Sequence, residues 1–167
     1  MTLEEVNRFS REEFVREFGW VYEHSPWVAE RAHASRPFAN AGALHAALAG
    51  EVDSADRSEQ LELLRAHPDL GARARMSQAS AGEQAGARLD RLSREEFDLL
   101  HRLNSAYKEK FGFPFIFAVK GSTKHDILKA LERRLHTSPE EELREALAQV
   151  KRISFFRLEE MLGGTVR

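Results

Sequence analysis

The sequence of 167 residues contains no cysteine, which excludes a disulfide-stabilised scaffold and any chemistry that uses a thiolate. It has no apolar run close to the roughly 20 residues that a membrane-spanning helix requires. Neither sign of charge is in excess, because 25 lysines and arginines face 27 aspartates and glutamates, for a formal net charge of −2. A strongly basic surface is therefore absent. We expect neither a nucleic acid nor a membrane as partner.

Several signatures of cofactor and metal sites are also missing. The sequence has no glycine-rich phosphate loop, no dinucleotide-binding fingerprint and no Gly-x-Ser-x-Gly motif. Its seven histidines lack the His-x-x-x-His spacing of a zinc site, so no metal site is predicted. The first residues are acidic, where a secretory signal would be basic and then apolar. We expect a cytoplasmic protein.

What the sequence does contain is a series of helix boundaries. Two serine–glutamate pairs, Ser10 with Glu13 and Ser93 with Glu96, have capping-box spacing and precede apolar residues at helical intervals. The length suits one domain, so residues 1–167 are predicted to form a single all-α domain. Further expected helix starts are Asn40, Ser122 and Ser138, and expected helix ends are His67, which precedes a proline, and Gly112.

The segment Phe113–Val119 has the composition of a β-strand, but no partner strand is evident elsewhere in the sequence. An isolated strand is not stable in water. We therefore predict a single-domain helical bundle with a buried extended connection around Phe113–Val119. Main-chain groups in such a connection need hydrogen-bond partners, and a ligand could supply some of them.

His67 lies at a predicted helix end and is followed by Pro68. A protonated imidazole there would suit the negative end of the helix dipole, which is a purely structural role. The alternative is a general acid or base that the following proline holds in place. The spacing alone leaves both interpretations open.

Ser80 and Glu83 form another capping-box pair, and Gln84 follows them. Capping alone accounts for this spacing. The first turn of a helix also presents free N–H groups and the positive end of a dipole, which suit an anionic or carbonyl-rich ligand. Glu83 and Gln84 could then bind amide or urea groups, so the two interpretations are not exclusive.

Arg157 lies among apolar residues of the last predicted helix, which runs from Ser138 to Leu158. One interpretation is a surface ion pair with Glu159 or Glu160. The other is a contact between the guanidinium and an anion or a carbonyl on the inner face of the helix.

Taken together, the motifs of this chain resemble the OHCU decarboxylase family, where OHCU is 2-oxo-4-hydroxy-4-carboxy-5-ureidoimidazoline. The motifs run in the family's order over nearly the whole length, and their joint pattern is highly specific. One departure is His136, where the family often has asparagine. The matching motifs are His67-Pro68-Asp69-Leu70-Gly71, Ser80-x-x-Glu83-Gln84, Asn104-x-x-Tyr107, Phe111-Gly112-Phe113-Pro114-Phe115-Ile116, Arg134-Leu135, and Ile153 to Arg157-Leu158.

The resemblance implies an all-helical fold, a homodimer, and no metal or organic cofactor. It implies a carboxy-lyase that converts OHCU to S-allantoin and CO2 in purine catabolism, with stereoselective protonation. The family's acid/base histidine corresponds to His67, with Glu83 as the second group of the reaction. The implied substrate contacts are Pro68, Ser80, Glu83, Gln84, the main chain of Phe115, Ile116, Phe117, Ala118 and Val119, and Arg157.

Two other functions stay open at this point. A non-catalytic helical interaction module would use the phenylalanine run as a partner groove and would tolerate replacement of His67. A hydrolase acting on a ureido purine catabolite would use Glu83 to activate water. Release of CO2 rather than ammonia or a ring-opened product distinguishes the lyase from the hydrolase.

Overall fold

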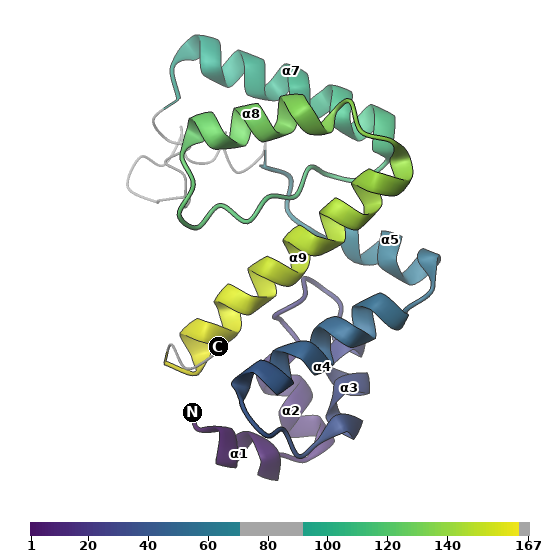
Figure 1. Cartoon of the computed structure of the whole chain (residues 1–167), viewed down its shortest axis with the longest axis vertical. Helices are drawn as coiled ribbons and strands as arrows, with labels where there is room; N and C mark the ends of the chain where they lie inside the picture. Colours follow the sequence, from purple (N-terminus) through teal and green to yellow (C-terminus); the bar gives the residue numbers. More distant parts are fainter. Residues whose placement is uncertain (71–91, 164–167) are drawn as a thin grey trace. The chain divides into compact units, whose positions relative to one another are not determined.

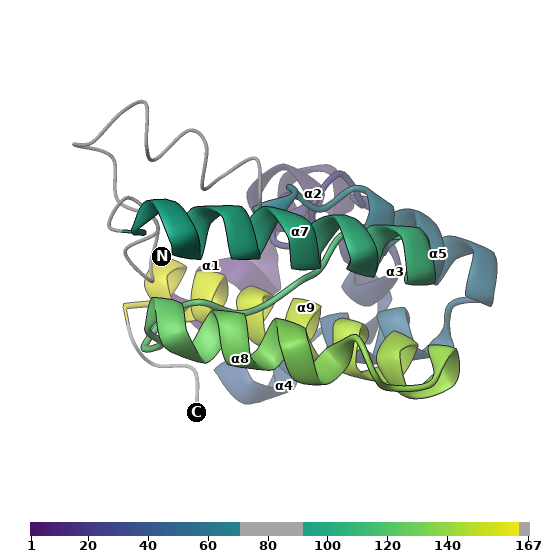
Figure 2. The ribbon, with the colours of Figure 1, turned by 90° about the horizontal axis from the view of Figure 1, so that it is seen from above.

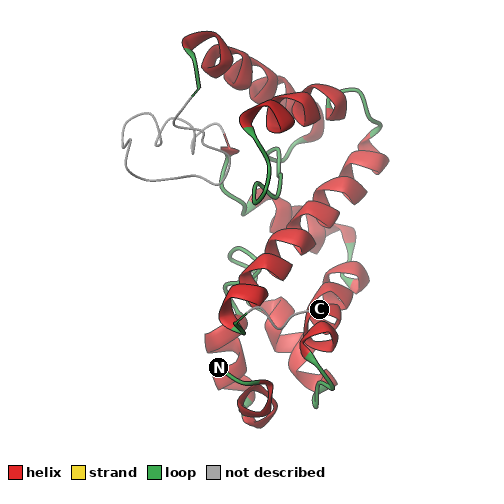
Figure 3. Ribbon diagram, turned by 60° about the vertical axis from the view of Figure 1, so that its left-hand side comes forward, coloured by secondary structure: helices red, strands yellow, loops and turns green. Residues whose placement is uncertain are grey.

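The computed structural model of the chain describes residues 1–70 and 92–163, and every regular element in these ranges is a helix (Figure 1; Figure 3). The prediction of an all-α fold is therefore confirmed. The elements are α1 (Leu3–Arg8), α2 (Arg11–Phe18), α3 (Trp27–Ala32), the 3-10 helix η1 (His33–Ser35), α4 (Ala41–Ser54), α5 (Arg57–Arg65), α7 (Arg94–Phe111), α8 (Lys124–Arg134) and α9 (Pro139–Met161).

Tertiary contacts divide the chain into two compact units. The first unit consists of Met1–Ala66 and Val150–Arg167, and the second unit consists of His67–Gln149. The helix α9 therefore contributes residues to both units. The prediction of one domain over residues 1–167 stays a prediction.

The first unit is built on short helices, with α3 packed against both α2 and α4. The ring centroids of Phe14 and Phe18 lie 4.9 Å apart, and that of Phe38 lies 5.9 Å from Phe14. All three phenylalanines are buried. The predicted cap at Asn40 is confirmed, because its side chain accepts a hydrogen bond from the Ala43 N–H at 2.8 Å and so begins α4.

In the second unit α7 lies beside α8 (Figure 1). The predicted capping box of Ser93 and Glu96 begins α7, and Gly112 ends that helix with a left-handed φ of 78°. The predicted cap of α8 was wrong by one residue. Thr123 caps the helix and Asp126 completes its capping box, whereas the N–H of Ser122 closes a turn onto the Val119 carbonyl.

The connection between α7 and α8 is neither helix nor strand, as predicted, and Figure 2 shows it as a thread between the two helices. Four of its side chains are buried, those of Phe113, Phe115, Ile116 and Ala118. The ring of Tyr107, on α7, lies 5.3 Å from that of Phe115, edge to face. This aromatic packing fixes the connection against α7.

Candidate active site

The predicted acid/base residue His67 lies in a short turn that follows α5, and its side chain is buried, with 7% exposure. Asp69 anchors this turn to α7. Its carboxylate accepts a hydrogen bond from Asn104 Nδ2 at 2.7 Å and pairs with the ammonium group of Lys108. The imidazole is thus held in a water-poor position at a defined point of the second unit.

The main chain of the 113–119 connection has partners on α8 and α9. The Ile116 carbonyl accepts a hydrogen bond from Arg134 Nη1 at 2.8 Å. The Ala118 N–H donates to Gln149 Oε1 at 2.9 Å. These two main-chain groups of the buried segment are therefore satisfied by long polar side chains.

A buried ion pair, between Arg134 and Glu142, contacts this connection through Arg134. Arg134 Nε donates to both carboxylate oxygens of Glu142, at 2.8 and 2.9 Å, and neither side chain is exposed. The Tyr107 hydroxyl donates to the same carboxylate at 3.0 Å. Burial is the main reason that the pKa of Tyr107 lies far above its ordinary value, so the phenol stays protonated.

Arg157 lies in the first unit, and its partner is not the one that its sequence neighbours suggested. Its Nη2 donates to Glu23 Oε1 at 2.6 Å, and among the described residues no ion pair joins it to Glu159 or Glu160, which was one of the two interpretations. Its Nη1 donates to the main-chain carbonyls of Trp20 and Val21, at 3.0 and 3.2 Å. The second interpretation of this arginine, a contact with a ligand, stays a prediction.

The predicted site residues that the structure describes are divided between the two compact units. His67, Pro68 and the main chain from Phe115 to Val119 lie in the second unit, whereas Arg157 lies in the first. Ser80, Glu83 and Gln84 lie outside the described residues. The joint role of His67 and Glu83 in the reaction thus stays a prediction.

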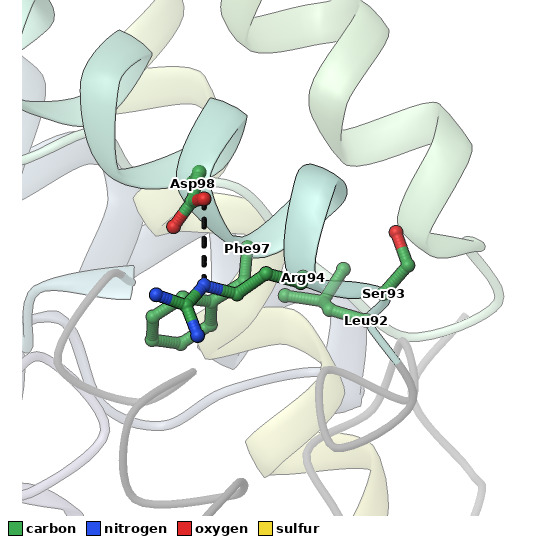
Figure 4. A pocket seen from close by; sticks show the side chains of 5 residues that line it. All are labelled: Leu92, Ser93, Arg94, Phe97 and Asp98. Atoms are coloured by element: carbon green, nitrogen blue, oxygen red, sulfur yellow. Dashed lines mark ion pairs between the residues drawn. The ribbon is translucent and has the colours of Figure 1, made fainter.

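A hollow of about 330 Å³ opens beside the first turn of α7 (Figure 4). An exposed ion pair one turn apart, Arg94 Nε to Asp98 Oδ2 at 3.5 Å, lies at its edge. The hollow is lined by Leu92, Ser93, Arg94, Phe97 and Asp98, none of which is a predicted site residue.

No helix in the described ranges is long and apolar enough to cross a membrane.

Comparison with known proteins decides the family. Residues 7–159 match the OHCU decarboxylase family. The chain is 51% identical over 160 residues to the 2-oxo-4-hydroxy-4-carboxy-5-ureidoimidazoline decarboxylase of Haloferax volcanii, covering 96% of this chain and 95% of that protein. The chain belongs to the OHCU decarboxylase family.

Two longer proteins contain a region similar to this OHCU decarboxylase family member. The present chain is 42% identical over 161 residues to the uric acid degradation bifunctional protein PucL of Bacillus subtilis, covering 96% of this chain and 33% of that protein. A crystal structure of (S)-allantoin synthase superposes with a TM-score of 0.79 at 34% identity, covering 96% of this chain and 54% of that one. The chain thus spans about half of the length of that solved structure.

Family membership confirms the resemblance seen in the motifs, and the structure adds contacts that the sequence did not reveal. Asn104 and Arg134 stood in matching motifs without an assigned role, and here they hold Asp69 and the Ile116 carbonyl. Gln149 stood in no motif. Besides its motif, the sequence signal for Arg134 was a charged residue next to the apolar positions of an amphipathic helix.

Proposed function

We propose that the chain is a cofactor-independent OHCU decarboxylase, which forms S-allantoin and CO2 in urate breakdown. The observation that supports this most strongly is the 51% identity to the Haloferax volcanii decarboxylase across 96% of the chain. The Bacillus subtilis relative, named for uric acid degradation, supports the metabolic setting. The buried position of His67 suits a group that must transfer a proton away from bulk water.

The substrate's own structure supplies the electron sink of the reaction. OHCU carries its carboxylate and hydroxyl on one ring carbon, next to a ring C=N bond. When the bond to the carboxylate breaks, CO2 leaves and the electron pair moves towards the C=N nitrogen, which gains a proton. The hydroxyl then loses its proton as the neighbouring carbon gains one on a single face. The protein has to align the breaking bond with the C=N and exclude water.

Most of the predicted residues have an assigned role in this scheme. His67 acts at the hydroxyl and carboxylate end of the substrate and moves protons there. Glu83 and Gln84 bind the ureido arm. Ser80, Arg157 and the main chain of residues 116–119 bind the amides and carbonyls of the ring. The phenylalanines of the connection keep water out, which weakens the solvation of the carboxylate and favours its loss.

The active form that we propose is a cytoplasmic homodimer, as the family resemblance implies. Analytical ultracentrifugation of the purified chain tests the assembly directly. A sedimentation coefficient that stays at the monomer value up to micromolar concentrations would contradict the dimer. It would not bear on the proposed reaction.

The decisive experiment feeds freshly generated OHCU to the protein and follows S-allantoin by circular dichroism. We expect the wild type to form the S enantiomer and H67A to be slower by about 10²–10⁴-fold, the usual contribution of a general acid or base. The matched control is H125A, because the His125 side chain is 75% exposed on α8. An H67A rate equal to that of H125A would remove His67 from the reaction.

The role of Glu83 is tested in the same assay with E83Q. We expect a lower rate at unchanged folding, because a neutral amide cannot replace a carboxylate that holds the ureido arm. Unchanged kinetics in E83Q would remove the carboxylate from the reaction and leave this residue with helix capping alone, a role that glutamine at this position also fills.

A further inference from the structure

Two polar side chains hold one edge of the connection between α7 and α8. Arg134 Nη1, on α8, donates a hydrogen bond to the carbonyl of Ile116 at 2.8 Å. Gln149 Oε1, on α9, accepts a hydrogen bond from the N–H of Ala118 at 2.9 Å. The two bound positions are separated by a single residue, Phe117, and all five residues belong to the second unit.

In an extended chain the N–H and C=O of one residue point to the same edge, and those of the next residue point to the opposite edge. The rings of Phe115 and Phe117 are stacked, with centroids 6.1 Å apart and planes inclined by 21°, as expected for side chains two positions apart on one face. The Phe117 main chain therefore faces away from Arg134 and Gln149. Within the described part of the chain, no group hydrogen-bonds to it.

The amide of Gln149 is itself oriented by a second contact. Its Nε2 donates to Glu145 Oε1 at 3.3 Å, one turn earlier on α9. A carboxylate can only accept here, so the amide nitrogen must face Glu145 and the amide oxygen must face the Ala118 N–H. The side chain is thus set to receive a main-chain donor, which favours a specific holding role over a chance surface contact.

We propose that Gln149 is a positioning residue of the decarboxylase. It holds Ala118 so that the N–H and C=O of Phe117 face the substrate and bind an amide of the OHCU ring. The inference rests on the proposed function, which places the substrate against the main chain from Ile116 to Val119. Arg134 binds the same edge at Ile116. It is completely buried, so replacing it would not separate a loss of positioning from a loss of stability.

The test compares Q149M, which keeps the length of the side chain and removes the acceptor, with Q60M as matched control. Gln60 also binds a main-chain group, the Val52 carbonyl at 2.9 Å, but in the first unit. We expect Q149M to raise the KM for OHCU about 10-fold, because a loosened Phe117 weakens binding in ground state and transition state alike. A merely structural loss would lower the apparent kcat through a smaller folded fraction and leave KM unchanged.

Rescue is tested with the exchanged pair Q149E plus E145Q. The carboxylate at position 149 still accepts from the Ala118 N–H, and the amide at position 145 donates to that carboxylate. We expect a KM within about 2-fold of wild type, since both hydrogen bonds are retained. Amide exchange of Ala118 by NMR should be faster in Q149M than in wild type and restored in the exchanged pair.

The outcomes separate the two proposals. A wild type that forms no S-allantoin from OHCU overturns the proposed function and the positioning role with it. An active wild type whose KM is the same in Q149M and Q60M overturns the positioning role alone. A raised KM in Q149M that the exchanged pair does not lower also overturns it, because the hydrogen bond would then not be the cause.

Discussion

Arg134 and Glu142 form an ion pair in the interior of the second unit, with both side chains fully buried. Such pairs lose much of their Coulombic gain to desolvation, so they contribute little net stability, yet removing one partner leaves a buried charge that is very unfavourable. Here the arginine also binds the Ile116 carbonyl, and the glutamate also accepts from the Tyr107 hydroxyl. The pair thus joins α7, α8, α9 and the connection through one polar network.

Replacing Arg134 with methionine is expected to lower the free energy of unfolding by about 3–5 kcal/mol, because Glu142 is left buried without a counter-charge. The double variant R134M with E142Q should recover part of that loss. The side-chain amide that E142Q introduces is neutral, and its oxygen can still accept the hydrogen bond from the Tyr107 hydroxyl. Urea denaturation measures all three proteins, and R94M serves as control, since the exposed Arg94–Asp98 pair contributes about 0–1 kcal/mol. A double variant less stable than R134M would contradict this account.

Helix boundaries could be predicted from the sequence because they depend on residues a few positions apart. The capping box of Ser93 and the left-handed Gly112 are such local features. The contacts that build the candidate site are different. Asp69 meets Asn104 across 35 positions, and Arg157 meets Glu23 across 134. Their partners depend on how helices pack, which no spacing rule encodes.

The Asp69–Asn104 hydrogen bond gives a second prediction, which concerns the turn that carries His67. We expect N104L to lower the kcat of the proposed decarboxylase about 10-fold, because the loosened turn misplaces the imidazole. The matched control is N7L. Asn7 anchors Phe38 by two hydrogen bonds, at 3.1 and 2.8 Å, in the first unit. N7L should lose stability and keep its kcat per folded molecule. Equal kcat values in the two variants would contradict the role of Asn104.

Arg157 gives a third prediction, because its planar fork reaches three acceptors at once, the Glu23 carboxylate and the carbonyls of Trp20 and Val21. A lysine ammonium cannot reproduce this geometry. We expect R157K to lower the free energy of unfolding by about 1–2 kcal/mol, measured with urea. The control R31K should change it less, since the Arg31 side chain, paired with Glu59, is 43% exposed. A loss in R157K no larger than in R31K would make the three contacts energetically negligible.

Glu96 gives a prediction for acid stability. The hydrogen bond from Lys124, at 2.7 Å, is the main cause that lowers the pKa of Glu96 from 4.5 to about 2, and the Ser93 N–H adds to it. A carboxylate whose pKa is lowered by folding stabilises the protein above its ordinary pKa, and this stabilisation disappears as the pH falls to the folded value.

The variant E96Q isolates this charge, since glutamine at the third helical position can still complete the capping box. We expect E96Q to be less stable than wild type above about pH 5, and the difference to shrink steadily between 4.5 and about 2. Urea denaturation across this range measures it. In a K124M background the main cause of the lowered pKa is gone, so the difference should be smaller and should vanish at a higher pH. A stability difference that stays constant down to about pH 2 would show that the Glu96 carboxylate is not what Lys124 stabilises.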